Sequence, residues 1–171
     1  MSIFTVKFYW ANRLMNYLIG EYECKLDTKG RMVVPASLKR QLPDAEREGL
    51  VVNRGFEKNL VIYTRAEWNK LLGQLARLNQ FQPKNRDFIR KFMSGATELM
   101  LDSAGRVLLP KALLEYAEIG TELVLACNLE KIEVWSKVKY QESLDGVSEE
   151  EFSDLAAQVM GGFNFGGDEN E

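Results

Sequence analysis

The sequence predicts an α+β fold in which two tandem β-rich halves pack on each other as a pseudo-dimer, with helices at the periphery. Three observations predict this fold: an internal repeat, a hairpin pattern after each copy of the repeat, and amphipathic segments between and after the copies. We expect the halves to pack together because a single short meander cannot bury enough apolar surface on its own.

The repeat aligns residues 20–38 (GEYECKLDTKGRMVVPASL) with residues 95–113 (GATELMLDSAGRVLLPKAL) at a constant offset of 75. Eight of the 19 aligned positions are identical, whereas chance would give roughly one. The identical pairs are Gly20/Gly95, Glu23/Glu98, Leu26/Leu101, Asp27/Asp102, Gly30/Gly105, Arg31/Arg106, Pro35/Pro110 and Leu38/Leu113. The chain is therefore interpreted as a tandem duplication.

Each copy is expected to form a strand, a tight turn, a second strand, a short helix and a hairpin, in that order. The turns begin with an aspartate that can cap its own backbone and end with a glycine that is free to take a positive φ. A short apolar run then predicts a buried strand, and the proline after it is typical of the first turn of a helix. The helices are predicted at 36–42 and 111–117, and the hairpins at 50–64 and 122–136.

Amphipathic helices are predicted between and after the repeats. A capping box begins at Thr64, and the apolar residues that follow it at helical spacing are Trp68, Leu71, Leu72, Leu75 and Leu78. A second helix is predicted at 84–94, after Pro83. A capping box at Ser148 begins the last helix, whose apolar face is Phe152, Leu155, Ala156 and Val159. Each of these faces needs a covering surface, on its own domain or on a neighbouring subunit.

The predicted organisation has six segments. They are an N-terminal extension (1–14), the first repeat with its following helix (15–80), a linker helix (81–94), the second repeat (95–140), a C-terminal helix (141–160) and a flexible acidic tail (161–171). The extension is interpreted as either a disordered segment or an artefact of start-codon choice.

Composition argues against hydrolytic and metal chemistry. The 171 residues include no histidine, the most common general base and transition-metal ligand. The two cysteines, Cys24 and Cys127, are far apart, so no disulfide framework is expected and a reducing cytosol is the expected compartment. The apolar stretch 3–19 is interrupted by polar residues and has no cleavage site, so no membrane partner is expected.

The formal charge of −3 conceals an uneven distribution. From residue 141 onward there are nine acidic residues and no basic one, whereas residues 1–140 hold 22 basic and 16 acidic residues. Residues 1–40 alone hold seven basic and three acidic residues. A chain with a basic first part and an acidic tail can bind phosphate on one face.

The two motifs, L-D-x-K-G-R-x-x-x-P-x-x-L and L-D-x-x-G-R-x-x-x-P-x-x-L-x-x-Y-A, closely resemble those of the MraZ family. That family belongs to the wider SpoVT-AbrB group of transition-state regulators and antitoxins, and the match runs from about Tyr17 to about Phe163. The resemblance implies two tandem swapped-hairpin AbrB-type β-barrel halves that form an intramolecular pseudo-dimer. One departure is that the second turn has Ala104 where the first has Lys29.

The resemblance also implies a function. It implies a sequence-specific, DNA-binding transcription regulator that binds direct repeats in the promoter of the division and cell-wall gene cluster as a ring of identical subunits. Such a protein would act in the cytoplasm, at the nucleoid. It would be no enzyme and would need no cofactor, metal ion or small-molecule substrate.

Five basic residues are the candidate DNA contacts. Arg31 and Arg106 are expected to reach guanine acceptors or phosphates. Backbone phosphates are the expected partners of Lys29, Lys39 and Arg40. The residues expected to shape the loops are Asp27, Gly30, Asp102 and Gly105. Because the second loop lacks a lysine, Arg31 with Lys29 is expected to do most of the reading and Arg106 to assist.

Three alternatives stay open from the sequence. Arg31 and Arg106 can instead pair with Asp27 and Asp102 and lock the turns. The chain can be an antitoxin-like or protein-binding oligomeric module whose loops touch a protein partner. An enzyme that used the two aspartates as paired carboxylates is the third, although no nucleophile, phosphate cradle or metal spacing supports it.

Overall fold

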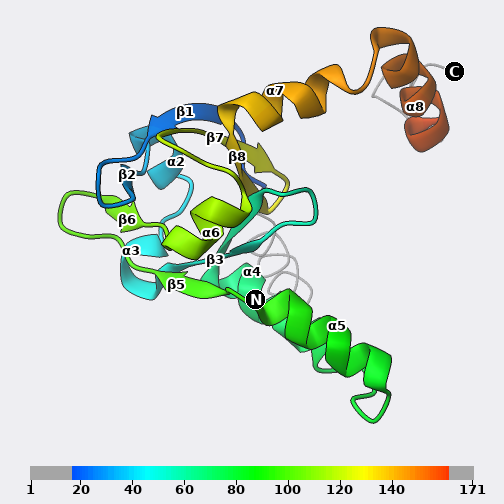
Figure 1. Ribbon diagram of the computed structural model, residues 1–171, viewed down its shortest axis with the longest axis horizontal. Helices are drawn as coiled ribbons and strands as arrows, with labels where there is room; N and C mark the ends of the chain where they lie inside the picture. Colours follow the sequence, from blue (N-terminus) through cyan, green and yellow to red (C-terminus); the bar gives the residue numbers. More distant parts are fainter. Residues whose placement is uncertain (1–16, 162–171) are drawn as a thin grey trace, which may run out of the picture. The chain divides into compact units, whose positions relative to one another are not determined.

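The computed structural model describes residues 17–161 and shows an α+β chain (Figure 1). The expectations for residues 1–14 and for the tail beyond 161 lie outside the described residues. In chain order the elements are β1 (Glu21–Lys25), β2 (Arg31–Val33), α2 (Ala36–Lys39), α3 (Ala45–Glu48), β3 (Leu50–Arg54), β4 (Leu60–Thr64), α4 (Arg65–Leu75), α5 (Pro83–Met93), β5 (Thr97–Leu99), β6 (Arg106–Leu108), α6 (Lys111–Tyr116), β7 (Glu122–Asn128), β8 (Lys131–Ser136), α7 (Lys137–Asp145) and α8 (Glu149–Met160).

Both repeats form the predicted order of strand, turn, strand, helix and hairpin. The helix predicted over 36–42 is shorter, because α2 ends at Lys39 and the backbone continues in tighter turns, with bonds from Gln41 N–H to the Leu38 carbonyl and from Leu42 N–H to the Lys39 carbonyl. Pro43 then prevents any continuation of the helix. The short helix α3 was not predicted. It ends at Gly49, whose φ of 73° is a left-handed conformation that favours glycine.

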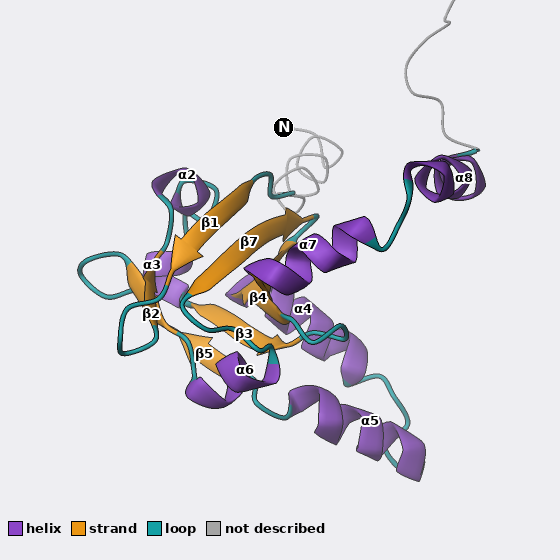
Figure 2. Ribbon diagram, turned by 45° about the horizontal axis from the view of Figure 1, so that its top comes forward, coloured by secondary structure: helices purple, strands orange, loops and turns teal. Residues whose placement is uncertain are grey.

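Strands are exchanged between the repeats in the six-stranded sheet, whose order is β1-β7-β8-β4-β3-β5. The first strand of each repeat pairs with the hairpin of the other, since β1 lies against β7 and β5 lies against β3 (Figure 2). The two hairpins meet where β4 pairs with β8. All of these pairings are antiparallel. Because each of them joins a strand of one repeat to a strand of the other, backbone hydrogen bonds connect the two repeats.

One core serves both repeats. Val52 and Leu60 of the first repeat and Leu99 and Leu125 of the second are all buried in the same apolar cluster. This cluster belongs to a compact unit that extends to Lys137 and holds both repeats. Neither repeat therefore has a core of its own.

The insert helices α4 and α5 cover one part of this unit with aromatic side chains. Thr64 Oγ1 accepts a hydrogen bond from the Glu67 backbone N–H at 3.2 Å and so caps α4. Only this half of the predicted capping box is found among the contacts of residues 17–161, because the Glu67 carboxylate pairs with Lys70. Trp68 is buried on α4. The centroid of its ring lies 5.4 Å from the ring centroid of Tyr63 and 6.0 Å from that of Phe92 on α5. The helix predicted over 84–94 is confirmed as α5, which begins one residue earlier, so that Pro83 lies in its first turn.

The second compact unit begins at Val138. The capping box predicted at Ser148 is confirmed as the start of α8, whereas the C-terminal helix expected over 141–160 is divided, because residues 146–148 separate α7 from α8. The Ser148 hydroxyl accepts from the Glu151 backbone N–H, and the Glu151 side chain accepts from the Ser148 N–H. No helix within residues 17–161 is long and apolar enough to cross a membrane.

The shared core predicts that damage in one repeat weakens both. Leu99 is 2% exposed, and truncating such a leucine to alanine costs about 2–5 kcal/mol. In the Leu99→Ala variant, native-state hydrogen exchange is expected to accelerate equally in β4 and in β7. The control is Leu108→Ala, whose side chain is 56% exposed and should matter little. Acceleration confined to the second repeat would contradict a single cooperative core.

Candidate nucleic-acid interface

Strands β2 and β6 form a separate two-stranded antiparallel sheet, which we call the ribbon. Successive residues of a strand point to opposite faces. Met32 and Val107, which pair with each other, are 2% and 1% exposed and face the core. The other face of the ribbon carries two arginines and two largely exposed apolar residues, which are Arg31, Val33, Arg106 and Leu108.

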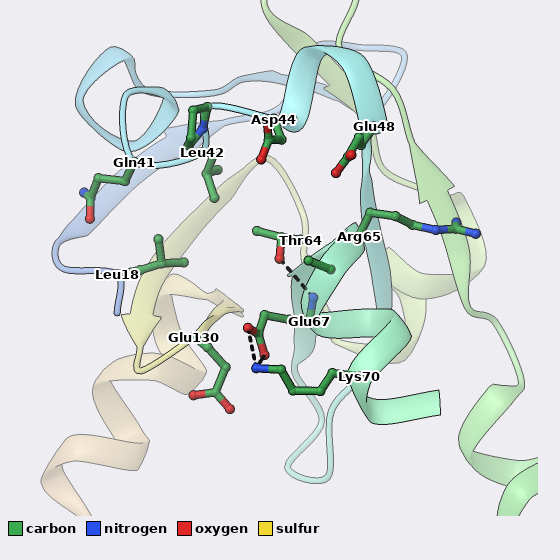
Figure 3. Close-up of a pocket in the computed structure, with 14 residues that line it drawn as sticks. Leu18, Gln41, Leu42, Asp44, Glu48, Thr64, Arg65, Glu67, Lys70 and Glu130 are labelled. Carbon is green, nitrogen blue, oxygen red and sulfur yellow. Dashed lines mark hydrogen bonds and ion pairs between the residues drawn. The ribbon is translucent and has the colours of Figure 1, made fainter. Parts of the chain in front are cut away.

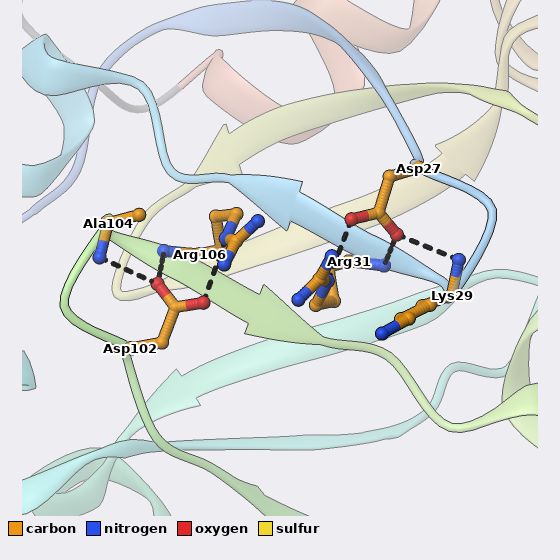
Figure 4. Close-up of polar contacts among 6 residues, drawn as sticks. All are labelled: Asp27, Lys29, Arg31, Asp102, Ala104 and Arg106. Atoms are coloured by element: carbon orange, nitrogen blue, oxygen red, sulfur yellow. Dashed lines mark hydrogen bonds and ion pairs between the residues drawn. The ribbon is translucent and has the colours of Figure 1, made fainter.

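The first turn of the ribbon (residues 27–30) is held by its aspartate (Figure 4). Asp27 Oδ1 accepts hydrogen bonds from the backbone N–H groups of Lys29 at 2.9 Å and Arg31 at 3.0 Å. Its other oxygen, Oδ2, accepts from Nε of Arg31 at 2.7 Å. A carboxylate with three donors is a strong turn former, because it replaces the backbone acceptors that a tight turn lacks.

The second turn (residues 102–105) repeats this geometry. Asp102 Oδ1 accepts from the N–H groups of Ala104 and Arg106, both at 2.9 Å, and Oδ2 accepts from Nε of Arg106 at 2.8 Å. The predicted alternative in which each arginine pairs with its own aspartate is therefore the arrangement that the structure adopts. Each arginine nevertheless uses only Nε in this pair.

Glycine is required in both turns. Gly30 has a φ of 82° and Gly105 a φ of 72°, which favour a residue without a side chain. The carbonyl of Gly30 accepts from the N–H of Leu109, and the carbonyl of Gly105 accepts from that of Val34, both at 3.0 Å. Each turn is thus braced by the strand of the other repeat.

The two arginines are partly exposed and keep free donor groups. Their side chains are 29% exposed at Arg31 and 33% exposed at Arg106. Within residues 17–161, the structure assigns no hydrogen-bond partner to the terminal Nη groups of either guanidinium. These groups can donate two parallel hydrogen bonds to a base edge or a phosphate while Nε stays on the aspartate.

The aspartates remain ionised in this arrangement. The backbone N–H of Arg31, then its side chain and the N–H of Lys29, lower the pKa of Asp27 from 3.8 to about 2, although partial desolvation opposes them. The equivalent bonds lower the pKa of Asp102. A carboxylate held in this way is a poor general acid, so the geometry gives no support to catalysis by paired carboxylates.

The three other predicted cations lie at different places around the ribbon. Lys29 is exposed in the first turn. Arg40 is exposed at the end of α2. Lys39 is on α2, where its ammonium pairs with Glu46 Oε1 at 2.5 Å. All five predicted residues thus belong to the ribbon, its turns or the helix that follows β2.

A hollow elsewhere on the same unit is unsuited to phosphate (Figure 3). It lies between α3 and the start of α4, and four of its lining residues are acidic, namely Asp44, Glu48, Glu67 and Glu130. Its lysine, Lys70, is bound to Glu67 at 2.9 Å. The ribbon is therefore the better candidate for a nucleic-acid contact.

Comparison with known proteins agrees with the duplicated motif. A sequence model of the family described as "MraZ protein, putative antitoxin-like" matches the chain twice, over residues 17–91 and 92–161. The chain belongs to the MraZ family. This finding confirms the resemblance that the two motifs indicated.

Three relatives bear the name transcriptional regulator MraZ. The protein of Christiangramia forsetii is 44% identical over 151 residues, which cover 88% of this chain and 97% of the relative. That of Flavobacterium psychrophilum is 40% identical over 151 residues, covering 88% and 96%. That of Cytophaga hutchinsonii is 38% identical over 146 residues, covering 85% and 96%.

One charged residue at this candidate interface was not predicted from the sequence. Glu46 lies on α3, a helix that the sequence pattern did not indicate, and it binds Lys39 from seven positions further along the chain. Side chains seven positions apart lie on one face of a helix but two turns from each other, and here they belong to two separate helices, so no i,i+3 or i,i+4 spacing indicated the pair. A basic residue followed by an acidic cluster was the only available signal.

The lowered pKa of Asp27 predicts a pH-dependent contribution to stability. A carboxyl whose pKa falls on folding stabilises the fold above its unfolded value, and this contribution is lost as pH falls toward the folded value. The melting temperature of Asp27→Asn should therefore lie below that of the wild type at pH 5 and above. The difference should shrink as pH falls from 3.8 toward about 2.

The control for this prediction is Asp87→Asn on α5. Asp87 also pairs with an arginine, Arg90, but both side chains are more than 70% exposed. Such surface pairs contribute little to stability. Its melting temperature should follow that of the wild type at every pH, and a difference as large as that of Asp27→Asn would refute a special role for the turn.

Proposed function

We propose that this chain is a sequence-specific DNA-binding transcription regulator that places the outer face of its ribbon in the major groove. The observation that carries the proposal is this face, where Arg31 and Arg106 present free Nη groups on adjacent antiparallel strands. A two-stranded β-ribbon fits the major groove, where guanine offers two acceptors to a bidentate arginine.

The remaining groups of the ribbon support this mode. Val33 and Leu108 are 58% and 56% exposed between the arginines, and such apolar groups can contact thymine methyl groups. Lys29, Lys39 and Arg40 are at the margins, where phosphates would lie, and hold the register. The aspartates would fix the direction of each guanidinium and reduce its attraction for unrelated phosphates.

Several copies are needed for a specific site. A bidentate arginine contributes roughly 1–3 kcal/mol of base discrimination, so the two arginines of one ribbon select too little sequence. We therefore propose a ring of identical subunits whose ribbons bind direct repeats upstream of the division and cell-wall gene cluster, in the cytoplasm at the nucleoid. The shared name of the relatives, transcriptional regulator, supports a regulatory role.

The strand pairings also support a finer description of the fold. Each repeat gives its first strand to the hairpin of the other, as expected for two swapped-hairpin AbrB-type β-barrel halves. In this proposal the two halves form one pseudo-dimer within a chain. One chain then supplies a complete ribbon, because β2 and β6 come from different repeats.

The proposal predicts that single ribbon substitutions reduce sequence preference. In gel-shift titrations, the wild type should bind the DNA upstream of its own gene more tightly than a scrambled duplex. Arg31→Ala and Arg106→Ala should each reduce this preference about 5- to 150-fold, the equivalent of roughly 1–3 kcal/mol. Arg31→Lys should reduce it too, because lysine cannot donate two parallel hydrogen bonds.

The matched control is Arg90→Ala on α5, which removes an exposed arginine that also pairs with an aspartate. It should leave sequence preference unchanged. If the wild type binds no duplex at any salt concentration, the proposal is rejected, and a protein-binding module of the antitoxin-like kind becomes the better explanation. Equal binding by wild type and Arg31→Ala would reject the assignment of the ribbon.

A further inference from the structure

The two repeats differ in where they carry lysine. At the offset of 75, Lys29 of the first turn corresponds to Ala104 of the second. At the same offset, Lys39 of α2 corresponds to Leu114 of α6. Compared along the sequence, the second repeat lacks both lysines. This comparison predicts that the first turn binds phosphate strongly and the second turn weakly.

The fold changes this comparison. A β-carbon built at Gly105 would lie 3.9 Å from Nζ of Lys39, so the lysine of the first repeat reaches the turn of the second. A β-carbon built at Gly30 would lie 3.6 Å from Cδ1 of Leu114. The first turn therefore has its own lysine and a leucine beside it, whereas the second has an alanine and a lysine beside it.

Backbone pairing explains this crossed arrangement. Val34 donates its N–H to the carbonyl of Gly105, and α2 begins two residues later. Leu109 donates to Gly30 in the same way, and α6 begins two residues after it. Each helix thus lies next to the turn of the opposite repeat. Lys39 of α2 is the lysine near the second turn, whereas the first turn has its own Lys29 and also Lys111 at the start of α6, which lines the same hollow as Lys29.

The ammonium groups of Lys29 and Lys39 differ in whether they are held by a carboxylate. Lys39 is bound to Glu46, whose carboxyl has a lowered pKa through its hydrogen bond with Lys39 and the charge of that lysine. Lys29 has no ion pair among the contacts of residues 17–161. Both partners of the Lys39 pair are accessible to solvent, at 38% and 68% exposure, so a phosphate can approach and replace the carboxylate.

We propose that Lys39 is the phosphate-binding cation of the second turn, in place of the lysine absent at Ala104, and that Glu46 competes with DNA for its ammonium. The inference rests on the proposed DNA binding and adds a residue that limits it. In the free protein Glu46 holds the ammonium. On the duplex a DNA phosphate replaces the Glu46 carboxylate. The second turn therefore binds phosphate through Lys39, but more weakly than the first turn does through Lys29.

The test is the salt dependence of binding to the DNA upstream of the gene. Each phosphate contact contributes about 0.9 to the slope of log affinity against log salt. Lys29→Ala and Lys39→Ala should each reduce the slope by about that amount for every subunit in contact. The double variant Lys39→Ala/Ala104→Lys should recover it, because the lysine then stands in the second turn itself.

A second variant tests the competitor without removing Lys39. Glu46→Gln should bind duplex more tightly than the wild type, on specific and scrambled DNA alike. Its matched control is Glu67→Gln on α4, which frees Lys70 from a similar ion pair and changes the net charge equally. Equal gains in the two variants would mean a general charge effect and would overturn the role of Glu46.

The failures of the two proposals can be separated. If the wild type binds no duplex, the proposed function fails and this inference fails with it. If the wild type binds and Lys29→Ala lowers the slope but Lys39→Ala does not, only this inference is overturned. Melting curves establish whether each variant is folded. If Lys39→Ala does not fold, the binding of Glu46→Gln tests the inference instead.

Discussion

The backbone ladder between β2 and β6 positions every charged group of the candidate interface. It is three residue pairs long and is extended by the bonds from Val34 to Gly105 and from Leu109 to Gly30. Because this ladder joins different repeats, it sets each turn beside the helix of the opposite repeat. The glycines make it possible, since a side chain at Gly30 would lie 3.3 Å from the Leu109 carbonyl in a left-handed backbone.

The order of elements could be predicted because local patterns determine it. The turn chemistry at Asp27 and Gly30, the prolines after the short strands, the N-cap at Thr64 and the capping box at Ser148 all act over a few residues. The partner of each strand could not be predicted in the same way. Alternating residues in β1 indicate a strand, but nothing within that segment selects β7 rather than β4. The strand exchange follows from packing both halves around one core.

At the candidate site, the sequence identified the residue types and left their geometry open. The recurrence of Asp and Arg in both turns allowed either a free arginine or one locked to its aspartate. The structure combines the two, because Nε is bound and the Nη groups are not. The crossed position of Lys39 and its bond to Glu46 could not be predicted, since they depend on contacts between repeats and on the short helix α3.

The pairing of β1 with β7 also bears on how the chain is made. Glu21 lies opposite Ala126, so the first strand has its partner about a hundred residues further along the chain. At translation rates of about 5–20 residues per second, that partner emerges roughly 5–20 s later. During this interval β1 has no partner strand, and its pairing with β7 is slow because the loop between them is long. The charged residues Glu21, Glu23 and Lys25 alternate along β1, and charges of this kind disfavour pairing of an unprotected strand with another chain.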